Sequence, residues 1–383
     1  MILFNYLKKQ DWFKTFLFYA FRIFPIKKRK IVFCNFSGKR CGDSPRVISD
    51  HLQKKHPDWD IVWLVHPKYN PEPPAGTRAA TFRMHSIKMI YELATAKVWV
   101  DSHTKFAFTR KRPHQFYMET WHGGIGLKKV EGDAAEVLDE PYLDRVRNNS
   151  RIADIFLSNS EWCSKLYRRA FWFNGEFLEF GLPRNDMLVK GEHSEKVRSA
   201  FGIPASTKIL LYAPTFRADE KTDCYSLDTR LILDALRKKY NCDWKILIRL
   251  HPVVMQKAPP IDFGDDVLDA TQYPDMQELL AESDALVSDY SSCIFDYALL
   301  KRPVFLFATD IEEYKKDRSF YFDLNELPFP VSTTNQALAE QILCWDGEQY
   351  SQELQKFMQN VGIKESGHAT ETAVERIEKW MES

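Results

Sequence analysis

The amino-acid sequence predicts an α/β protein with two doubly wound parallel sheets that face each other across a cleft. Short apolar runs of strand type alternate with segments of helical period, which is typical of parallel α/β sheets. The 383 residues are too many for one ordinary domain and suit two. One charge-rich stretch, Lys190–Ser206, interrupts the alternation near the middle of the chain and is interpreted as a connector.

The first domain is predicted to occupy residues 30–190. The predicted strands are Ile31–Phe36, Ile61–Val65, Lys97–Asp101, Phe116–Trp121, Ile155–Ser158 and Phe177–Phe180. The predicted helices are Pro45–Lys55, Ile87–Ala96 and Glu161–Phe171. Each strand is a short apolar run, and each helix has apolar residues three and four positions apart.

The second domain is predicted to occupy residues 207–365, followed by a C-terminal helix at 366–383. The predicted strands are Lys208–Ala213, Trp244–Leu250, Ala285–Ser288 and Pro303–Phe307, and the predicted helices are Leu227–Tyr240 and Met276–Ser283, with a further helix between the last two strands. Ligands of such sheets bind at the carboxyl ends of the strands. We therefore expect functional residues just after each strand.

Residues 1–29 are predicted to form an amphipathic helix that associates with a membrane. Met1–Lys30 holds eight Lys or Arg and a single Asp. Apolar residues recur at three- and four-residue steps, namely Leu3, Phe4, Leu7, Phe13, Phe16, Leu17, Ala20, Phe21 and Phe24. The charges interrupt any run long enough to span a bilayer, and no small-residue cleavage site follows. The basic cluster Lys27–Lys30 favours an anionic lipid surface, although a helix packed on the protein's own surface would have the same pattern.

The composition excludes several classes of protein. Lys plus Arg and Asp plus Glu are equal at 53 each, so no overall positive field attracts nucleic acid. The seven cysteines form no CxxC pair and no zinc spacing, which argues against a metal ribbon and against a secreted disulfide framework. We expect a reducing, cytoplasmic compartment.

One strand-to-helix junction has the residue types of an anion site. The stretch ALVSDYSSCIFDYALLKRPVFLF predicts strand, turn, helix and strand in succession. Its first turn carries Asp289, Tyr290, Ser291 and Ser292. Ser or Asp can cap the helix there, and the free N–H groups of the first helical turn can bind phosphate. Plain capping explains the same residues, so both interpretations stay open.

Three further motifs follow predicted strands. TWHGGIGLKK begins at Thr120, YAPTFR ends at Arg217, and IRLHP contains Arg249 and His251. In the first, His122 enters a loop in which Gly123 and Gly124 permit close backbone approach and Lys128 supplies charge. A histidine in such a place can be a general base, being close to half-protonated near neutral pH. It can equally be a satisfied loop residue, and His251 has the same two interpretations.

Taken in order, these motifs carry a resemblance to a known family. TWHGGIGLKK, SNSEWCSKLYRRAF, EFGLPRND, LLYAPTFR, LIRLHP and SDYSSCIFDYALLKRPVFLF resemble those of the CDP-glycerol glycerophosphotransferases of teichoic acid and capsule synthesis. The resemblance covers roughly Phe116 to Tyr321. The family usually has Trp-His-Gly-Thr-Pro-Leu-Lys where this chain has glycine at 124 and 126 and isoleucine at 125, so the loop differs in stiffness and a different acceptor is open.

The resemblance implies two Rossmann-like domains of the GT-B type and a peripheral enzyme on the cytoplasmic face of the cell membrane. It implies transfer of glycerol phosphate or ribitol phosphate from a CDP-alditol to an undecaprenyl-linked or polymeric saccharide. His122 matches the family's proposed catalytic base. His251 and the turn Asp289–Ser292 match the place where the donor diphosphate is held.

The chemistry also follows from the residue types. The protein must hold the donor diphosphate, neutralise the charge that builds on it and bring an acceptor hydroxyl in line. The catalytic candidates are His122 and His251; the donor-binding candidates are Arg217, Arg249, Asp289, Ser291, Ser292 and Arg302; the acceptor-loop candidates are Gly123, Gly124 and Lys128. No motif demands a cofactor or a metal, although a weak magnesium effect through phosphate oxygens stays open.

Two other functions compete with this one. A glycosyltransferase of the same architecture would use the same diphosphate site for a nucleotide sugar, and an inactive membrane adaptor would keep the fold without the chemistry. Retention of His122, His251 and the serine turn disfavours the adaptor. The sequence does not distinguish glycerol from ribitol, primase from polymerase, or a monomer from a homo-oligomer.

Overall fold

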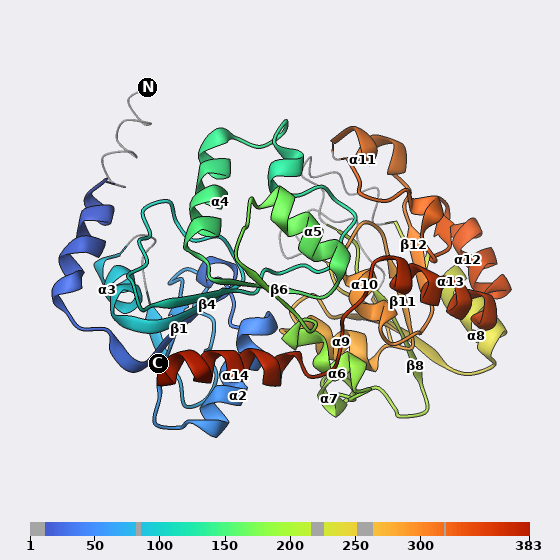
Figure 1. Ribbon diagram of the computed structural model, residues 1–383. Coiled ribbons are helices and arrows are strands. Elements are labelled where there is room, and N and C mark those ends of the chain that lie inside the picture. The colour runs from blue at the N-terminus through green and yellow to red at the C-terminus, as the bar shows by residue number, and fades with distance from the viewer. Residues whose placement is uncertain (1–11, 82–85, 216–225, 251–262, 318) are drawn as a thin grey trace. The chain divides into compact units, whose positions relative to one another are not determined.

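The computed structural model describes residues 12–81, 86–215, 226–250, 263–317 and 319–383. The chain divides into two compact units (Figure 1). Unit 1 comprises Met1–Gly124, Val130–Asp186 and Lys364–Ser383, and unit 2 comprises Ile125–Lys129 and Met187–Ile363. The two parallel sheets confirm the predicted fold class.

The sheet of unit 1 has seven parallel strands among the described residues, in the order β3-β2-β1-β4-β5-β6-β7. They are β1 (Lys27–Cys34), β2 (Asp60–Val65), β3 (Arg78–Thr81), β4 (Ala96–Asp101), β5 (Phe116–Glu119), β6 (Ile155–Ser158) and β7 (Glu176–Glu179). The central strands are buried on both faces and are therefore nearly continuous apolar runs.

Helices flank this sheet. Residues 12–20 are helical, and the further elements are η1 (Phe21–Ile23), η2 (Phe36–Gly38), α2 (Asp43–Lys55), α3 (Ile87–Thr95), η3 (Glu131–Ala134), α4 (Glu140–Ile152), α5 (Glu161–Ala170), η4 (Pro183–Asn185) and α14 (Ala369–Glu382). Their starts follow sequence signals: the side chains of Ser86, Asp139 and Ser160 accept backbone N–H bonds at the starts of α3, α4 and α5.

The C-terminal helix α14 belongs to unit 1 and lies beside α2 (Figure 1). Its apolar residues Ala373, Val374 and Ile377 are buried in the same core as Ile48 and Leu52 of α2. This spacing, with apolar positions three and four residues apart, predicted the helix from the sequence. The sequence did not predict which sheet the helix would cover.

The sheet of unit 2 has six parallel strands among the described residues, in the order β10-β9-β8-β11-β12-β13. They are β8 (Lys208–Tyr212), β9 (Trp244–Ile248), β10 (Val267–Asp269), β11 (Ala285–Ser288), β12 (Val304–Phe307) and β13 (Val331–Ser332). The helices are α7 (Glu195–Phe201), α8 (Thr229–Tyr240), α9 (Met276–Glu282), α10 (Cys293–Ala298), α11 (Ile311–Asp317), η6 (Leu324–Glu326), α12 (Asn335–Cys344) and α13 (Gly347–Asn360), and α6 (Asp186–Val189) spans the boundary between the units.

Short or polar elements escaped the sequence prediction. The strands β10 and β13 have three residues or fewer, and β3, Arg78–Thr81, has two alanines as its only apolar residues. None of them carries the apolar run that predicts a strand. The predicted connector Lys190–Ser206 contains α7, which buries only Val197. Helix α4 was missed because most of its residues are polar or charged, and only Leu143 and Val146 supply apolar side chains to its buried face.

The N-terminal prediction needs one correction. Lys27–Lys30 is not the basic end of a helix, because β1 begins at Lys27. Lys30 is fully buried and forms an ion pair with Glu92, 2.5 Å away. Lys27, Lys28 and Arg29 are exposed. No helix among the described parts of the chain is both long and apolar enough to cross a bilayer.

Candidate active site

Each sheet has one point at which the strand order reverses. In unit 1 the chain passes from β1 to β2 and β3 on one side, and resumes with β4 on the other side of β1. In unit 2 the order reverses in the same way between β8 and β11. Open α/β sheets bind ligands outside the carboxyl ends of the strands at such points. Most of the predicted site residues that the structure describes follow these strands or their neighbours.

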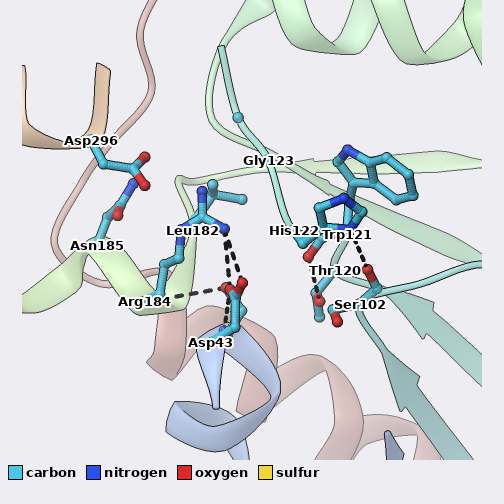
Figure 2. A network of polar contacts seen from close by, with 12 residues as sticks. Asp43, Ser102, Thr120, Trp121, His122, Gly123, Leu182, Arg184, Asn185 and Asp296 are labelled. Atoms are coloured by element: carbon cyan, nitrogen blue, oxygen red, sulfur yellow. Dashed lines mark hydrogen bonds and ion pairs between the residues drawn. The ribbon is translucent and has the colours of Figure 1, made fainter. Parts of the chain in front are cut away.

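His122 lies at this edge of unit 1, just after β5. Its Nδ1 is 2.9 Å from the backbone oxygen of Ser102, which follows β4 (Figure 2). A carbonyl oxygen only accepts, so Nδ1 carries the hydrogen and Nε2 carries a lone pair. The ring centres of Trp121 and Phe36 lie 4.0 Å and 5.0 Å from that of His122. His122 therefore presents an unprotonated Nε2 in a fixed orientation.

The protonation state of His122 differs from the sequence expectation. Burial lowers the pKa of His122 to about 4, and the opposing effect of its hydrogen bond to the Ser102 carbonyl is smaller. The imidazole is therefore neutral near pH 7, whereas the sequence suggested that it is close to half-protonated. A neutral imidazole can accept a proton without first losing one.

The glycine loop after His122 is closely packed. Tyr167, which is buried on α5, donates from its hydroxyl to the backbone oxygen of Gly123 at 3.0 Å. A Cβ at Gly124 would lie 2.4 Å from Nδ2 of Asn159, which follows β6. Gly124 therefore permits the close packing of the Asn159 side chain on this loop, and Gly123 supplies a backbone acceptor that fixes the loop.

A buried carboxylate holds the residue before His122. Trp121 has φ 53°, which is uncommon for a residue with a side chain, and its N–H donates to Glu119 at 3.0 Å. Glu119 also accepts from the Tyr117 hydroxyl at 2.6 Å and from the Asn149 amide at 2.9 Å. Burial, and after it the charge of Asp101, raises the pKa of Glu119 to about 7. The sequence did not single out this network.

A second imidazole lies beside His122. The ring of His103 is nearly parallel to that of His122, at an interplanar angle of 14° and a centroid separation of 5.8 Å. His103 follows β4 as His122 follows β5, but it lacks the glycine-rich loop that identified His122 in the sequence. Arg145 of α4 lies next to it, with Nη2 3.2 Å from Nδ1 of His103.

The motif GLPRND supplies an ion pair to the same unit. Nη1 of Arg184 lies 3.2 Å from both carboxylate oxygens of Asp43, the first residue of α2, as Figure 2 shows. Arg184 is only 6% exposed, and its backbone N–H donates to the hydroxyl of Ser44. Asp43 raises and Arg184 lowers the pKa of His122, so the pair acts electrostatically on the imidazole. The motif is part of the family resemblance, but the sequence alone assigned no role to its residues.

In unit 2, Asp289 organises the loops at the switch point. Its carboxylate accepts from the backbone N–H of Thr215, which follows β8, at 2.9 Å and 3.1 Å, and from that of Tyr290 at 2.5 Å. Asp289 is 2% exposed. It ties the loop after β8 to the loop after β11, which is a positioning role and not a direct contact with an anionic donor.

The other described donor candidates at this edge are Ser291, Ser292 and Arg249. Ser292 precedes α10 but its side chain makes no capping hydrogen bond, and the Ser291 hydroxyl accepts a long bond of 3.4 Å from the N–H of Cys293. Arg249 follows β9 and is half-buried, with Nη1 3.3 Å from the sulfur of Met276. One guanidinium, that of Arg249, and the hydroxyls of Ser291 and Ser292 thus lie in loops at the carboxyl edge of the unit 2 sheet.

Lys128 belongs to unit 2, although the sequence grouped it with the acceptor loop. Its segment pairs with the chain near Phe320, and its ammonium lies 5.1 Å from the ring centre of Tyr314. The ring of Tyr314 stacks on that of Tyr290 at 4.1 Å. Lys128 is therefore one aromatic ring away from the turn that contains Ser291.

Arg302 is a correction to the predicted donor site. It precedes β12 and therefore lies at the amino edge of the sheet, whereas Ser291 and Ser292 follow β11 at the carboxyl edge. Its guanidinium donates to the backbone oxygens of Ala281 and Ser283 at 2.8 Å and 2.6 Å. Arg302 satisfies the end of α9, and we leave it out of the proposed site. The candidates Arg217 and His251 lie outside the described residues.

The sequence model of the CDP-glycerol:poly(glycerophosphate) glycerophosphotransferase family matches residues 16–379. The chain is 31% identical over 371 residues to a teichoic acid poly(glycerol phosphate) polymerase of Staphylococcus epidermidis, covering 92% of this chain and 51% of the relative. It is 28% identical over 378 residues to a teichoic acid ribitol-phosphate primase of Bacillus spizizenii, covering 94% of each.

Among solved structures, the wall teichoic acid polymerase TagF is similar to this protein, with a TM-score of 0.84 and 28% identity. The match covers all of this chain, 100%, and 96% of that one. The chain spans about half the length of the polymerases of Staphylococcus epidermidis and Bacillus subtilis that it matches, 51% of each.

Proposed function

The chain belongs to the CDP-glycerol:poly(glycerophosphate) glycerophosphotransferase family, and we propose that it transfers glycerol phosphate or ribitol phosphate from a CDP-alditol to a hydroxyl of a lipid-linked saccharide or a growing polymer. The product is a teichoic acid or a capsule-like surface polymer, and CMP is released. The observation that carries this proposal is His122, whose Nδ1 is fixed on Ser102 while Nε2 stays unprotonated. One relative is named for glycerol phosphate and another for ribitol phosphate, so the proposal includes both CDP-glycerol and CDP-ribitol as donors.

In the reaction, Nε2 of His122 accepts the proton of the acceptor hydroxyl as its oxygen attacks the β-phosphorus of the donor. The new phosphorus–oxygen bond forms, and the bond between that phosphorus and the oxygen of CMP breaks, so CMP leaves with the electron pair. General base catalysis of this kind contributes about a hundred- to ten-thousandfold in rate. Glu119 and Ser102 support this catalysis indirectly. Glu119 holds the backbone of Trp121, and the Ser102 carbonyl fixes the tautomer of His122.

Unit 2 holds the donor. Arg249 and Lys128 supply positive charge for the diphosphate, and the hydroxyls of Ser291 and Ser292 supply hydrogen bonds. His251 and Arg217, which follow strands of the same sheet in the sequence, complete the set. Asp289 positions the loops that carry these groups, since it accepts from two backbone N–H groups. No cofactor or metal is needed for this step, and added EDTA is expected to leave most of the activity.

We also propose that the enzyme works at the cytoplasmic face of the cell membrane as a peripheral protein. The helix at residues 12–20 is anchored by Phe18, which is 1% exposed and packs on Phe108. Its remaining face is apolar and exposed: Trp12 is 72%, Phe13 51%, Phe16 53% and Tyr19 49% exposed. Such a face with basic residues nearby at Lys27, Lys28 and Arg29 suits insertion into an anionic interface.

The membrane proposal is tested by substitution, not by truncation. Removing residues 1–24 would also remove Phe18 and the packing of Phe21 and Phe24 on Tyr91. Trp12, Phe13 and Phe16 are therefore replaced together by serine, and binding to anionic vesicles is measured by sedimentation. Loss of binding with unchanged melting temperature supports the proposal. Unchanged binding at moderate salt rejects it.

The function is tested by incubating the purified protein with CDP-glycerol, CDP-ribitol and a panel of nucleotide sugars. Each donor is supplied with a lipid-linked saccharide acceptor, and the released nucleotide is measured. Release of CMP from one CDP-alditol supports the proposal. Release of UDP from a nucleotide sugar would indicate a glycosyltransferase instead, and no release from any donor would favour an inactive adaptor.

A further inference from the structure

His103 is fixed as firmly as the proposed base, but with the opposite hydrogen-bonding character. Its Nδ1 lies 3.2 Å from Nη2 of Arg145, 3.3 Å from the hydroxyl of Thr104 and 3.5 Å from the backbone oxygen of Thr104. The guanidinium only donates and is nearer than the carbonyl oxygen, so we assign Nδ1 of His103 as an acceptor, with the hydrogen of the neutral ring on Nε2. Arg145 is held in place because it also donates to the backbone oxygens of Thr104 and Lys105.

The neutral state of His103 has an electrostatic cause in its surroundings. Burial lowers the pKa of His103, and the positive charge of Arg145 lowers it further. Asp101 opposes this effect, but its carboxylate is engaged by Lys105 at 2.5 Å and accepts the backbone N–H of His103. The hydrogen bond to the Thr104 backbone oxygen also raises the pKa of His103, and Lys39 acts in the same direction as Arg145. Near pH 7 the ring therefore offers an N–H and no charge.

The two histidines form a complementary pair. The Nδ1 atom of His122 faces Ser102, the Nδ1 atom of His103 faces Arg145, and neither Nε2 has a protein partner within the described part of the chain. One Nε2 is an acceptor and the other is a donor. A hydroxyl oxygen that binds two nitrogens at its roughly tetrahedral angle separates them by about 4.6 Å. The two rings, whose centres lie 5.8 Å apart and whose planes differ by 14°, are close enough for such a bridge.

We propose that His103 is a second functional histidine, which binds the oxygen of the acceptor hydroxyl through its Nε2–H while that hydroxyl donates its hydrogen to Nε2 of His122. This inference rests on the proposed function and adds the way in which unit 1 binds its substrate. One lone pair of the oxygen is engaged by His103, and the other is left for attack on phosphorus. The proton passes to His122 as before, and His103 keeps its own proton throughout.

This role has a kinetic signature that differs from that of the base. The hydrogen bond from His103 forms in the ground state and loses strength as the oxygen gives up electron density to phosphorus. Its loss should therefore weaken acceptor binding more than it slows the chemical step. Removal of the base should do the reverse.

The first experiment determines the tautomers directly. The protein is labelled with ¹⁵N-histidine, and two-dimensional ¹H–¹⁵N spectra are recorded at pH 7, with His103→Gln and His122→Gln used for assignment. We expect a protonated Nδ1 in His122 and a protonated Nε2 in His103. A His103 ring with its hydrogen on Nδ1 would overturn the inference, whatever the kinetics.

The second experiment uses three variants of His103. Gln places its amide nitrogen near the position of imidazole Nε2, and Asn places it near that of Nδ1. With the active CDP-alditol and a water-soluble saccharide bearing one glycerol phosphate as acceptor, His103→Leu and His103→Asn should raise the acceptor KM about three- to tenfold, the loss of one neutral hydrogen bond. His103→Gln should restore much of the affinity, and the donor KM should not change in any of them.

A control variant, together with the activity of the wild type, distinguishes failure of the His103 inference from failure of the proposed function. His51, on α2 of the same unit, is replaced by Gln and should change neither constant. An unchanged acceptor KM in a folded His103→Leu protein overturns this inference alone. A wild-type protein that is inactive with both CDP-alditols overturns the proposed function and this inference with it.

Discussion

The two sheets share the strand order 3-2-1-4-5-6, to which unit 1 adds β7, yet their switch points carry different chemistry. In unit 1 the edge near β1 and β4 holds two neutral imidazoles above a buried network with Glu119. In unit 2 the edge near β8 and β11 holds a cation, hydroxyls and an aspartate that binds backbone N–H groups. The same topology therefore serves proton transfer in one unit and anion binding in the other.

The difference lies in what is buried. Unit 1 buries ionisable side chains close to the site, so their protonation is set by desolvation. In unit 2 the buried Asp289 is satisfied by backbone donors, and Arg249 is left half-exposed at the edge. We therefore expect mutations at the unit 1 site to affect turnover or acceptor binding, and mutations at the unit 2 site to affect donor affinity.

The largest effect is expected for His122→Ala. We expect kcat to fall at least about a hundredfold, because the general base acts only as the transition state forms. The dissociation constant of the CDP-alditol, measured by calorimetry, should stay the same because the donor is held by unit 2. Turnover equal to that of the wild type would remove His122 from the mechanism.

The complementary effect is expected for Arg249→Ala and Ser291→Ala. Each removes a proposed partner of a charged diphosphate, so donor affinity should fall about tenfold to a hundredfold, or about 1.5–3 kcal/mol. The change Lys356→Ala on the exposed face of α13 serves as the control in the same unit. Donor affinity that is unchanged in both variants would place the nucleotide elsewhere.

A smaller effect, on stability, is expected for Gly124→Ala. The new Cβ would displace Nδ2 of Asn159, which donates to Glu365 at 3.1 Å. The free energy of unfolding should fall by about 1–3 kcal/mol. Gly264→Ala, where a Cβ meets no atom within 4 Å, is the control. In an Asn159→Ala background the same glycine substitution should cost much less, and an equal cost would show that the clash lies elsewhere.

The smallest effect concerns the pH dependence of stability. The pKa of Glu119 is raised from 4.5 to about 7, so the folded chain holds a proton that the unfolded chain loses. Its contribution to the free energy of unfolding therefore falls as pH rises from about 4.5 to about 7, and is constant above that. Urea unfolding of wild type and Glu119→Gln at pH 5 and pH 8 should show the variant gaining relative stability at pH 8. A difference that does not change with pH would contradict the raised pKa.

Much of the fold follows from local sequence, because short apolar runs between turns predict strands and capped amphipathic segments predict helices. The strands at Ile155–Ser158 and Ala285–Ser288 have the predicted bounds. The site was predictable only in part. His122 stood out because a glycine-rich loop follows it, whereas Glu119 is embedded in an apolar strand and its role depends on Tyr117 and Asn149. Contacts between residues distant in sequence leave no local pattern.

The same limit explains Arg302 and His103. Arginine near a serine turn in the sequence suggested a phosphate ligand, but the intervening helix and turn bring Arg302 back to the amino edge of the sheet. His103 lacks glycine neighbours, and its tautomer is set by Arg145, which is 42 residues away in the chain. The position of a residue before or after a strand predicts whether it lies at the amino or the carboxyl edge of the sheet. Its role there depends on hydrogen-bond partners that are distant in the sequence.

The placement of α14 has a consequence for the order of folding. Most of unit 2 is a continuous stretch, Met187–Ile363, which can fold when it has been synthesised. The core of unit 1 includes Ala373, Val374 and Ile377, and Glu365 accepts hydrogen bonds from Asn159 and Asn185. Synthesis of unit 1 begins first but ends last. A chain released before residue 364 would therefore contain a nearly complete unit 2 and an incomplete unit 1, the unit that carries His103 and His122.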